Sequence, residues 1–308
     1  MKNNFYLIII FLITILFSTK INALENKILF KIDNEIVTSL DILNEIKYLK
    51  IISKELQNIE SEQLYEISKN SLIKEKIKKI ELLKNFKKIE VDEKLVNDVL
   101  LGGFKKFNIS SKNELFEFLK NQKIDLETIR DKIEIEILWN QLIFYKYSNN
   151  LKIDKEIIKK DISNKKKQKE FLLSEIIFNL EKKEKLNEKF DLIKKTITNR
   201  SFSQAAIIYS TSDTAKVGGK LGWIKFSSLN QRIKDQITKI TAGNFTEPIV
   251  IPGGFLILKI NEIRDVNIEI DIKKEIEQTV NEIKNNQLNQ YSSIYFNKVK
   301  KDILIYEN

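Results

Sequence analysis

Histidine and cysteine, the two residue types that most often supply catalytic bases, nucleophiles and metal ligands, are both absent from this 308-residue chain. Their absence excludes Ser-His and Cys-His nucleophile pairs and removes the usual ligands of zinc and copper. Most hydrolase and metalloenzyme functions are therefore excluded. We expect no metal and no small-molecule cofactor.

One remaining candidate for acid–base chemistry is a carboxylate within a run of hydroxyl residues. Asp213 lies between Ser212 and Thr214, shortly before the segment Gly218-Gly219-Lys220-Leu221-Gly222-Trp223. Asp213 is as consistent with a turn or a helix cap as with catalysis. The glycines do not have the spacing of a phosphate-binding loop, and we expect them to occupy turns with positive φ.

These residues belong to a segment that differs from the rest of the chain. Six of the eight glycines and both prolines lie between Gly218 and Gly254. The hydrophobic period changes to strand-like upstream of this segment, where Phe171–Phe178 is apolar on both faces and predicts a central strand. Helices at about 182–198, 202–208 and 229–240 and strands at 247–251 and 255–263 complete the pattern. It predicts a compact α+β unit of about 100 residues.

The preceding region shows helical periodicity. A short hairpin at 28–37 is followed by a helix capped by Thr38 or Ser39, a second helix at 61–86, a third that Gly102 and Gly103 interrupt, and a long helix that Asp125 opens. Beyond residue 271 a last helix has an apolar stripe without a helical neighbour in its own segment. We expect it to fold back on the N-terminal helices.

The first residues resemble an export signal. An apolar run from Phe5 to Phe17 follows Lys2, and small and polar residues lead to Ala23. The run is shorter than the roughly 20 residues that cross a bilayer, so we predict a signal peptide at 1–23, cut after Ala23, and a periplasmic location. An uncleaved membrane anchor is the alternative. The net charge of +10 comes from lysines spread among glutamates, which predicts solvated helix surfaces and no nucleic-acid partner.

Several segments resemble a known family in order and spacing. The strand FLLSEIIFNL, the helix ending in Tyr-Ser, the GGKLGW segment, the Thr-Ala-Gly and Glu-Pro-Ile loop and the strand GFLILKI together resemble a parvulin-type prolyl isomerase domain. The region from KIDNEIVTSLDI to LETIRDKIEIEILWNQL resembles the N-terminal chaperone domain of SurA. The resemblance implies an α+β chain with a helical chaperone domain at 24–165, a parvulin-like domain at 166–266 and a C-terminal helix at 267–308 that completes the first domain.

The resemblance also implies where a site would lie. The positions at which active parvulins have histidines are Glu175 and Leu256, and Asp213 corresponds to the family's acidic or thiol residue. Leu229 and Ile233 correspond to the residues that grip the proline ring. Trp223 and Phe255 complete the candidate substrate-binding residues; for Trp223, core packing is the alternative. Glu175 could also be an exposed strand residue.

Two functions remain open. Prolyl isomerisation lowers a torsional barrier of roughly 18–20 kcal/mol and breaks no covalent bond, so an apolar slot could retain some activity. A carboxylate in place of an imidazole costs desolvation unless its pKa rises, and leucine forms no hydrogen bond. The residues therefore predict weak or absent isomerase activity in a periplasmic chaperone whose clients are unfolded polypeptides, outer-membrane proteins above all. The alternative is an active isomerase with a non-standard site.

Overall fold

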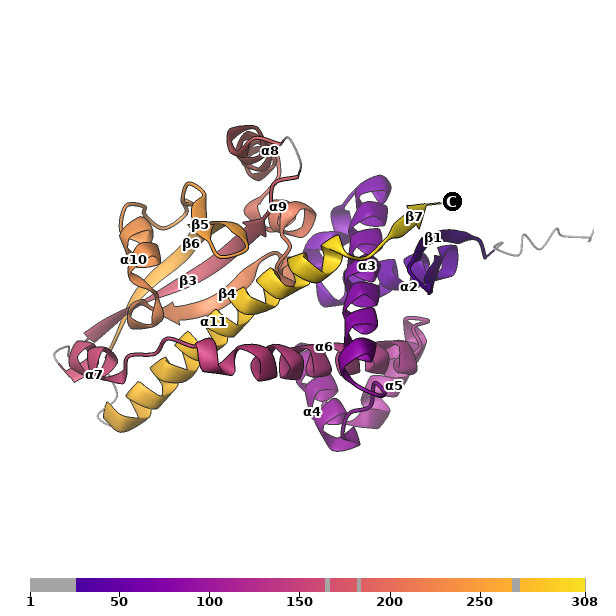
Figure 1. Cartoon of the computed structure of the whole chain (residues 1–308), viewed down its shortest axis with the longest axis horizontal. Coiled ribbons are helices and arrows are strands. Elements are labelled where there is room, and N and C mark those ends of the chain that lie inside the picture. The colour runs from indigo at the N-terminus through magenta and orange to yellow at the C-terminus, as the bar shows by residue number, and fades with distance from the viewer. Residues whose placement is uncertain (1–25, 164–166, 182–183, 268–271, 308) are drawn as a thin grey trace, which may run out of the picture.

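A computed structural model of the chain describes residues 26–163, 167–181, 184–267 and 272–307 (Figure 1). The predicted signal peptide, with its cut after Ala23, lies outside the described residues. Within the ranges that are described, no helix is long and apolar enough to cross a membrane.

The chain begins with the predicted hairpin. Strand β1 (Ile28–Ile32) pairs antiparallel with β2 (Glu35–Thr38), and the C-terminal strand β7 (Ile305–Glu307) pairs with the other edge of β1. Thr38 caps helix α2 (Ser39–Ile52) through a capping box, as predicted. The third strand was not predicted, because three residues after a long helix give no detectable period.

The N-terminal half is otherwise helical, and its apolar stripes pack against one another. Its remaining elements are η1 (Lys54–Asn58), α3 (Ser61–Asn85), α4 (Glu93–Phe104), η2 (Lys105–Phe107), α5 (Lys112–Asn121), α6 (Leu126–Tyr147), η3 (Ser148–Asn150) and α7 (Lys155–Ser163). The expectation that Gly102 and Gly103 interrupt a helix was wrong, since α4 continues through both. Burial of Val96, Leu100 and Phe104 on one face outweighs the cost of about 1 kcal/mol for each glycine.

The C-terminal helix α11 (Ile272–Lys301) returns to the N-terminal helices, as expected. Tyr295, Phe296 and Val299 lie in the same buried cluster as Trp139 of α6. The indole Nε1 of Trp139 donates a hydrogen bond to Oγ of Ser292 at 2.8 Å. The apolar stripe of α11 is therefore buried against the helical domain, which it completes.

Between these parts of the chain lies a four-stranded antiparallel sheet in the order β4-β3-β6-β5. Its strands are β3 (Lys167–Phe178), β4 (Lys220–Lys225), β5 (Ile249–Ile251) and β6 (Gly254–Asn267), and its helical segments are α8 (Leu186–Asn199), α9 (Phe202–Tyr209), η4 (Asp213–Val217), η5 (Phe226–Ser228) and α10 (Gln231–Ile237). The predicted strand at 171–178 is central, as expected. The limits predicted for the domains (24–165, 166–266 and 267–308) stay predictions.

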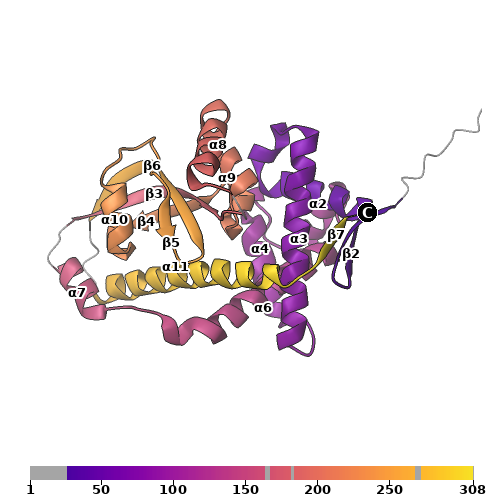
Figure 2. The same cartoon turned by 45° about the horizontal axis from the view of Figure 1, so that its top comes forward.

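The two faces of this sheet bury different clusters. Alternate residues of β3 point to opposite faces, so Ile176 and Phe178 pack with α8 and α9, whereas Phe171, Leu173 and Ile177 pack with α10. Figure 2 shows α8 and α9 on one side of the sheet and α11 on the other. The α10 face is thus the one nearer the C-terminal helix.

Candidate functional site

Glu175 lies on the α10 face of the sheet, near the end of β3. Its cross-strand partner on β6 is Leu258. The Oε1 atom of Glu175 accepts hydrogen bonds from Oγ of Ser212 at 2.6 Å and from Oγ1 of Thr214 at 2.8 Å. The alternative of an exposed strand residue was therefore wrong, because the turn η4 folds over the carboxylate.

The environment of Glu175 favours the protonated form. Burial raises the pKa of this carboxyl above its ordinary value of 4.5, and the two hydroxyl donors offset that rise only in part. The charge of Lys74 also lowers this pKa, but burial outweighs these contributions together. Glu175 therefore carries a higher affinity for its proton than a surface glutamate.

Three of the predicted residues meet in one cluster. Leu229 precedes α10, Ile233 lies on α10 and Leu256 lies on β6 opposite Ile177, and all belong to the same buried cluster. Their exposed fractions are 9%, 7% and 4%. We call Leu229, Ile233 and Leu256 the apolar slot; that they bind a proline ring stays a prediction.

Trp223 and Phe255 are not brought to the apolar slot. Phe255 packs with the cluster on the α8/α9 face and stacks on Phe178, with ring centroids 5.5 Å apart. Trp223 pairs with Leu172 across β3 and β4, and its ring is covered by the guanidinium of Arg264 at 4.0 Å. Both therefore lie on the face away from α10, where packing explains them.

Asp213 is held by lysines from another part of the chain. Its Oδ1 atom forms ion pairs with Nζ of Lys74 at 2.6 Å and of Lys78 at 3.2 Å, and both lysines belong to α3. Lys74 also donates to the carbonyl oxygen of Thr211 at 3.0 Å. Asp213, which we predicted to correspond to the family's acid, is thus a contact between the sheet domain and the helical domain.

These ion pairs extend into a larger network. Lys78 pairs with Glu136 of α6 at 2.6 Å, and Glu136 pairs with Lys216 of η4 at 3.6 Å. Burial opposes ionisation of Asp213, but the charges of Lys74, Lys78 and Lys216 outweigh it and hold the pKa of Asp213 well below 3.8. The pKa of Lys216 is raised, because the carboxylates, Glu136 first, outweigh its burial. Asp213 is therefore ionised, and its charge holds the sheet domain against α3.

The sequence did not indicate Lys74, Lys78 or Glu136 as part of the site. Lys74 and Lys78 are four residues apart, so they share a helix face, but the chain contains 53 lysines and arginines and the pair does not stand out. The side chain of Lys78 is only 1% exposed. Burial of a lysine is a property of tertiary packing, which no local pattern reveals.

The arrangement limits the chemistry that is available. The hydroxyls of Ser212 and Thr214 contact a carboxylate and no imidazole, and Leu256 offers no hydrogen bond. In the part of the chain that the structure describes, no group of three or more acidic side chains could hold a metal ion. What remains is a buried apolar cluster and a half-buried carboxyl on the same face of the sheet.

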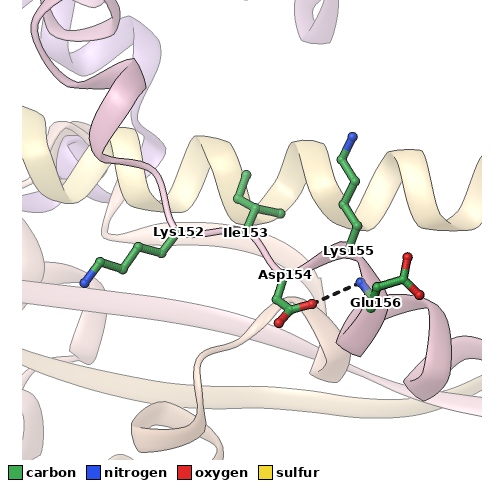
Figure 3. A pocket seen from close by; sticks show the side chains of 5 residues that line it. All are labelled: Lys152, Ile153, Asp154, Lys155 and Glu156. Atoms are coloured by element: carbon green, nitrogen blue, oxygen red, sulfur yellow. Dashed lines mark hydrogen bonds between the residues drawn. The ribbon is translucent and has the colours of Figure 1, made fainter.

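A surface hollow elsewhere does not alter this assignment. It has a volume of about 480 Å³ and is lined by residues 152–156, between α6 and α7 (Figure 3). Oδ1 of Asp154 accepts from the backbone amides of Glu156 and Ile157, both at 3.0 Å. Asp154 thus caps the start of α7, and the hollow contains none of the predicted site residues.

Comparison with known proteins defines the class of the sheet domain. Residues 163–262 match the family model of the PPIC-type PPIASE domain, or rotamase. This part of the chain is similar to parvulin-type domains, and a longer part is similar to proteins named Chaperone SurA. It is 26% identical over 176 residues to Chaperone SurA of Pectobacterium atrosepticum, covering 54% of this chain and 41% of that one.

Other relatives cover shorter or more distant stretches. Chaperone SurA of Pseudomonas aeruginosa is 44% identical over 63 residues, which is 20% of this chain and 15% of that protein. The chain thus matches less than half the length of these two relatives. A solved structure of SurA-like chaperones from Campylobacter jejuni is 18% identical and covers 92% of this chain and 99% of its own, with a TM-score of 0.36.

Proposed function

We propose that this protein is a periplasmic chaperone that binds unfolded polypeptides and carries a parvulin-type domain with little or no isomerase activity. The similarity to proteins named Chaperone SurA supports the chaperone part. The signal-like N-terminal segment supports export. Outer-membrane proteins are the proposed clients, because exported chaperones of this kind meet them unfolded.

The proposal rests on the two residues, Glu175 and Leu256, that stand where active parvulins have histidines. Glu175 is bonded to two hydroxyls beneath η4, and Leu256 is 4% exposed within the apolar slot. Leu256 forms no hydrogen bond, and Oε1 of Glu175 is already engaged by Ser212 and Thr214. The slot itself retains the apolar character that would bind a proline ring.

A paired assay on one preparation of the full chain tests the proposal. Aggregation of a denatured porin-like outer-membrane protein is followed by light scattering, and isomerisation of a Xaa-Pro tetrapeptide is followed in parallel. We expect suppression of aggregation near equimolar ratios and no acceleration of isomerisation. Rapid isomerisation at low protein concentration without protection of the client would instead establish the alternative, an active isomerase with a non-standard site.

A further inference from the structure

We propose that the small sheet β2-β1-β7 and the first turn of α2 together form a surface that binds an anionic lipid bilayer. The inference goes beyond the proposed chaperone function, because neither client binding nor isomerisation involves contact with a membrane. We call this surface the outer sheet face, and its side chains are those of Ile28, Lys31, Ile36, Leu40, Leu304 and Tyr306.

The strand register places three of these side chains in one row. Lys31 of β1 lies opposite Ile36 of β2 and opposite Tyr306 of β7, and residues directly opposite one another point to the same face of a sheet. The neighbours of Lys31 on β1, Phe30 and Ile32, point the other way and are buried in the core of the helical domain. The row therefore lies on the side of the sheet away from that core.

The side chains around this row are large, apolar and exposed. Leu304 directly precedes β7, and Ile28 pairs with Thr38, two residues before Leu40. Exposed apolar side chains gathered on one surface mark an interaction site more often than single ones do. The exposed fractions are 47% for Ile28, Ile36 and Leu40, 60% for Leu304 and 54% for Tyr306.

The charges on this sheet favour an anionic partner. Glu35 of β2 pairs with Lys76 at 3.1 Å and with Lys79 at 2.8 Å, and Glu307 of β7 pairs with Lys69. Three lysines thus face the two glutamates of these strands, and the lysine at the centre of the row adds a further positive charge. Lysine beside tyrosine and aliphatic side chains suits an anionic bilayer, where cations meet phosphate groups and apolar side chains enter the acyl boundary.

The same charge argues against a second copy of the chain as the partner. A two-fold contact brings one patch against the identical patch of the other copy. Centred on this row, such a contact would place Lys31 against its own counterpart between two apolar surfaces. Phosphate groups of a bilayer instead provide the opposite charge.

The outer sheet face lies where the predicted export signal joins the folded protein. Oδ1 of Asn26 accepts hydrogen bonds from the backbone amide of Leu40 at 3.2 Å and from Oγ of Ser39 at 3.4 Å, so Asn26 is fixed beside this face. The apolar run that begins at Phe5 ends at Phe17, and the connection from there to Asn26 spans at most roughly 30 Å. Until the predicted signal peptide is cut, the face is therefore held within roughly that distance of the bilayer.

The arrangement of the elements leaves this end of the molecule separate from the parvulin-type domain. Figure 1 shows β1 and β7 side by side at the opposite end of the molecule from α7, and Figure 2 shows β2, β7 and α2 together at the same end. A bilayer at the outer sheet face therefore leaves the four-stranded sheet and α10 facing away from the lipid.

The test uses the mature exported protein, with its N-terminus confirmed by mass, and co-sedimentation with lipid vesicles. One set of vesicles is a three-to-one mixture of phosphatidylethanolamine and phosphatidylglycerol, and the other is phosphatidylcholine alone, both in about 0.1 M NaCl. We expect the wild type to bind the anionic vesicles at least tenfold more tightly than the neutral ones. The double variant Ile36→Ser/Tyr306→Ser should lose at least tenfold in affinity for the anionic vesicles.

A matched variant controls for the loss of apolar surface. Ile157→Ser/Val250→Ser removes two side chains that are also exposed but lie on α7 and β5, and it should bind the anionic vesicles as the wild type does. Lys31→Glu reverses the central charge and should weaken binding to anionic vesicles while leaving the neutral ones unaffected. This variant decides the question if Ile36→Ser/Tyr306→Ser does not fold.

Three results overturn the proposal. They are equal binding of the wild type to both kinds of vesicle or to neither, undiminished binding by the folded double variant, and undiminished binding by Lys31→Glu. Sedimentation velocity without lipid identifies a second copy as the partner instead, if a dimer of the wild type is lost in Ile36→Ser/Tyr306→Ser. None of these results bears on protection of an outer-membrane protein from aggregation, so the chaperone function is tested separately.

Discussion

Glu175 on β3 and Asp213 on η4 are acidic residues at two positions of one candidate site, and their surroundings differ. Glu175 meets hydroxyl groups, and burial raises its pKa. Asp213 meets lysines from α3, whose charges overcome its burial and lower its pKa. The surroundings therefore shift the pKa values of the two carboxyls in opposite directions.

This difference shows what each position contributes. The charge of Asp213 joins two domains, and the carboxyl of Glu175 fills a polar site beneath a turn. The lowered pKa of Asp213 makes its carboxylate a weak base at neutral pH. The parvulin-type domain thus keeps its fold while its acidic residues serve docking and local structure.

The largest expected effect comes from removing the buried lysine of the docking network. Lys78→Ala leaves Glu136 and Asp213 without their shared partner, and loss of one partner from a buried pair costs about 3–5 kcal/mol. Because Asp213 is 44% exposed and Glu136 is 34% exposed, we expect about 2–3 kcal/mol less stability in urea unfolding. The matched change Lys112→Ala breaks a surface pair with Glu93 and should leave stability almost unchanged. Equal losses would contradict the assigned role of Lys78.

A smaller effect is expected where the sheet domain touches α11. Gly253→Ala and Gly243→Ala both place a side chain at positive φ, at 93° and 91°, which costs about 1–2 kcal/mol. Of these two glycines, Gly253 has neighbours within 4 Å of the added Cβ atom, and Gly243 has none. We therefore expect Gly253→Ala to lower the melting temperature more than Gly243→Ala, by differential scanning calorimetry. Identical shifts would show that α11 does not press on this turn.

Acid should weaken the docking of Asp213. A carboxyl whose pKa is lowered in the folded state stabilises the protein above its ordinary pKa, and that contribution is lost as pH falls through the folded-state pKa. We expect the unfolding free energy of the wild type to fall below pH 3.8, and that of Asp213→Asn to fall less over the same range. If the unfolding free energies of the two proteins fell equally below pH 3.8, the low pKa of Asp213 would be contradicted.

The smallest effect, of opposite sign, is expected at Glu175. A carboxyl whose pKa is raised in the folded state lowers stability as pH rises from its ordinary pKa of 4.5 through the folded-state value. Glu175→Gln removes the charge and keeps an oxygen that can accept from Ser212 and Thr214. At pH 7 the variant should be at least as stable as the wild type in thermal unfolding, and a clear loss would show that the ionised form is stabilising.

The sequence predicted those parts of the fold that local patterns specify. The run at 171–178 predicted the central strand, Asp125 predicted the start of α6, and the stripe beyond residue 271 predicted the return of α11. The predicted helix break at Gly102 and Gly103 was wrong, because the packing of α4 outweighs the low helix propensity of glycine. Strand β7 was missed, because its pairing with β1 joins residues at the two ends of the described chain.

The residues of the candidate site also fall into two groups, those that the sequence placed correctly and those that it did not. Leu229, Ile233 and Leu256 meet as the resemblance implied, since neighbouring elements of one domain fix them. Trp223 and Phe255 lie on the other face, because pleating decides the face residue by residue. Lys74 and Lys78 could not be found, since their contacts to Asp213 depend on how two domains pack. Sequence patterns thus placed three apolar residues of the sheet domain together and missed the lysines of α3.

The most direct test of the central claim, that this parvulin-type domain has lost its catalytic chemistry, is the isomerisation rate of a Xaa-Pro tetrapeptide with full-length wild type and Glu175→Gln. The account predicts that both proteins leave the rate at its uncatalysed value over a wide range of protein concentration. Acceleration by the wild type that Glu175→Gln abolishes would contradict it, because Glu175 would then be a catalytic residue.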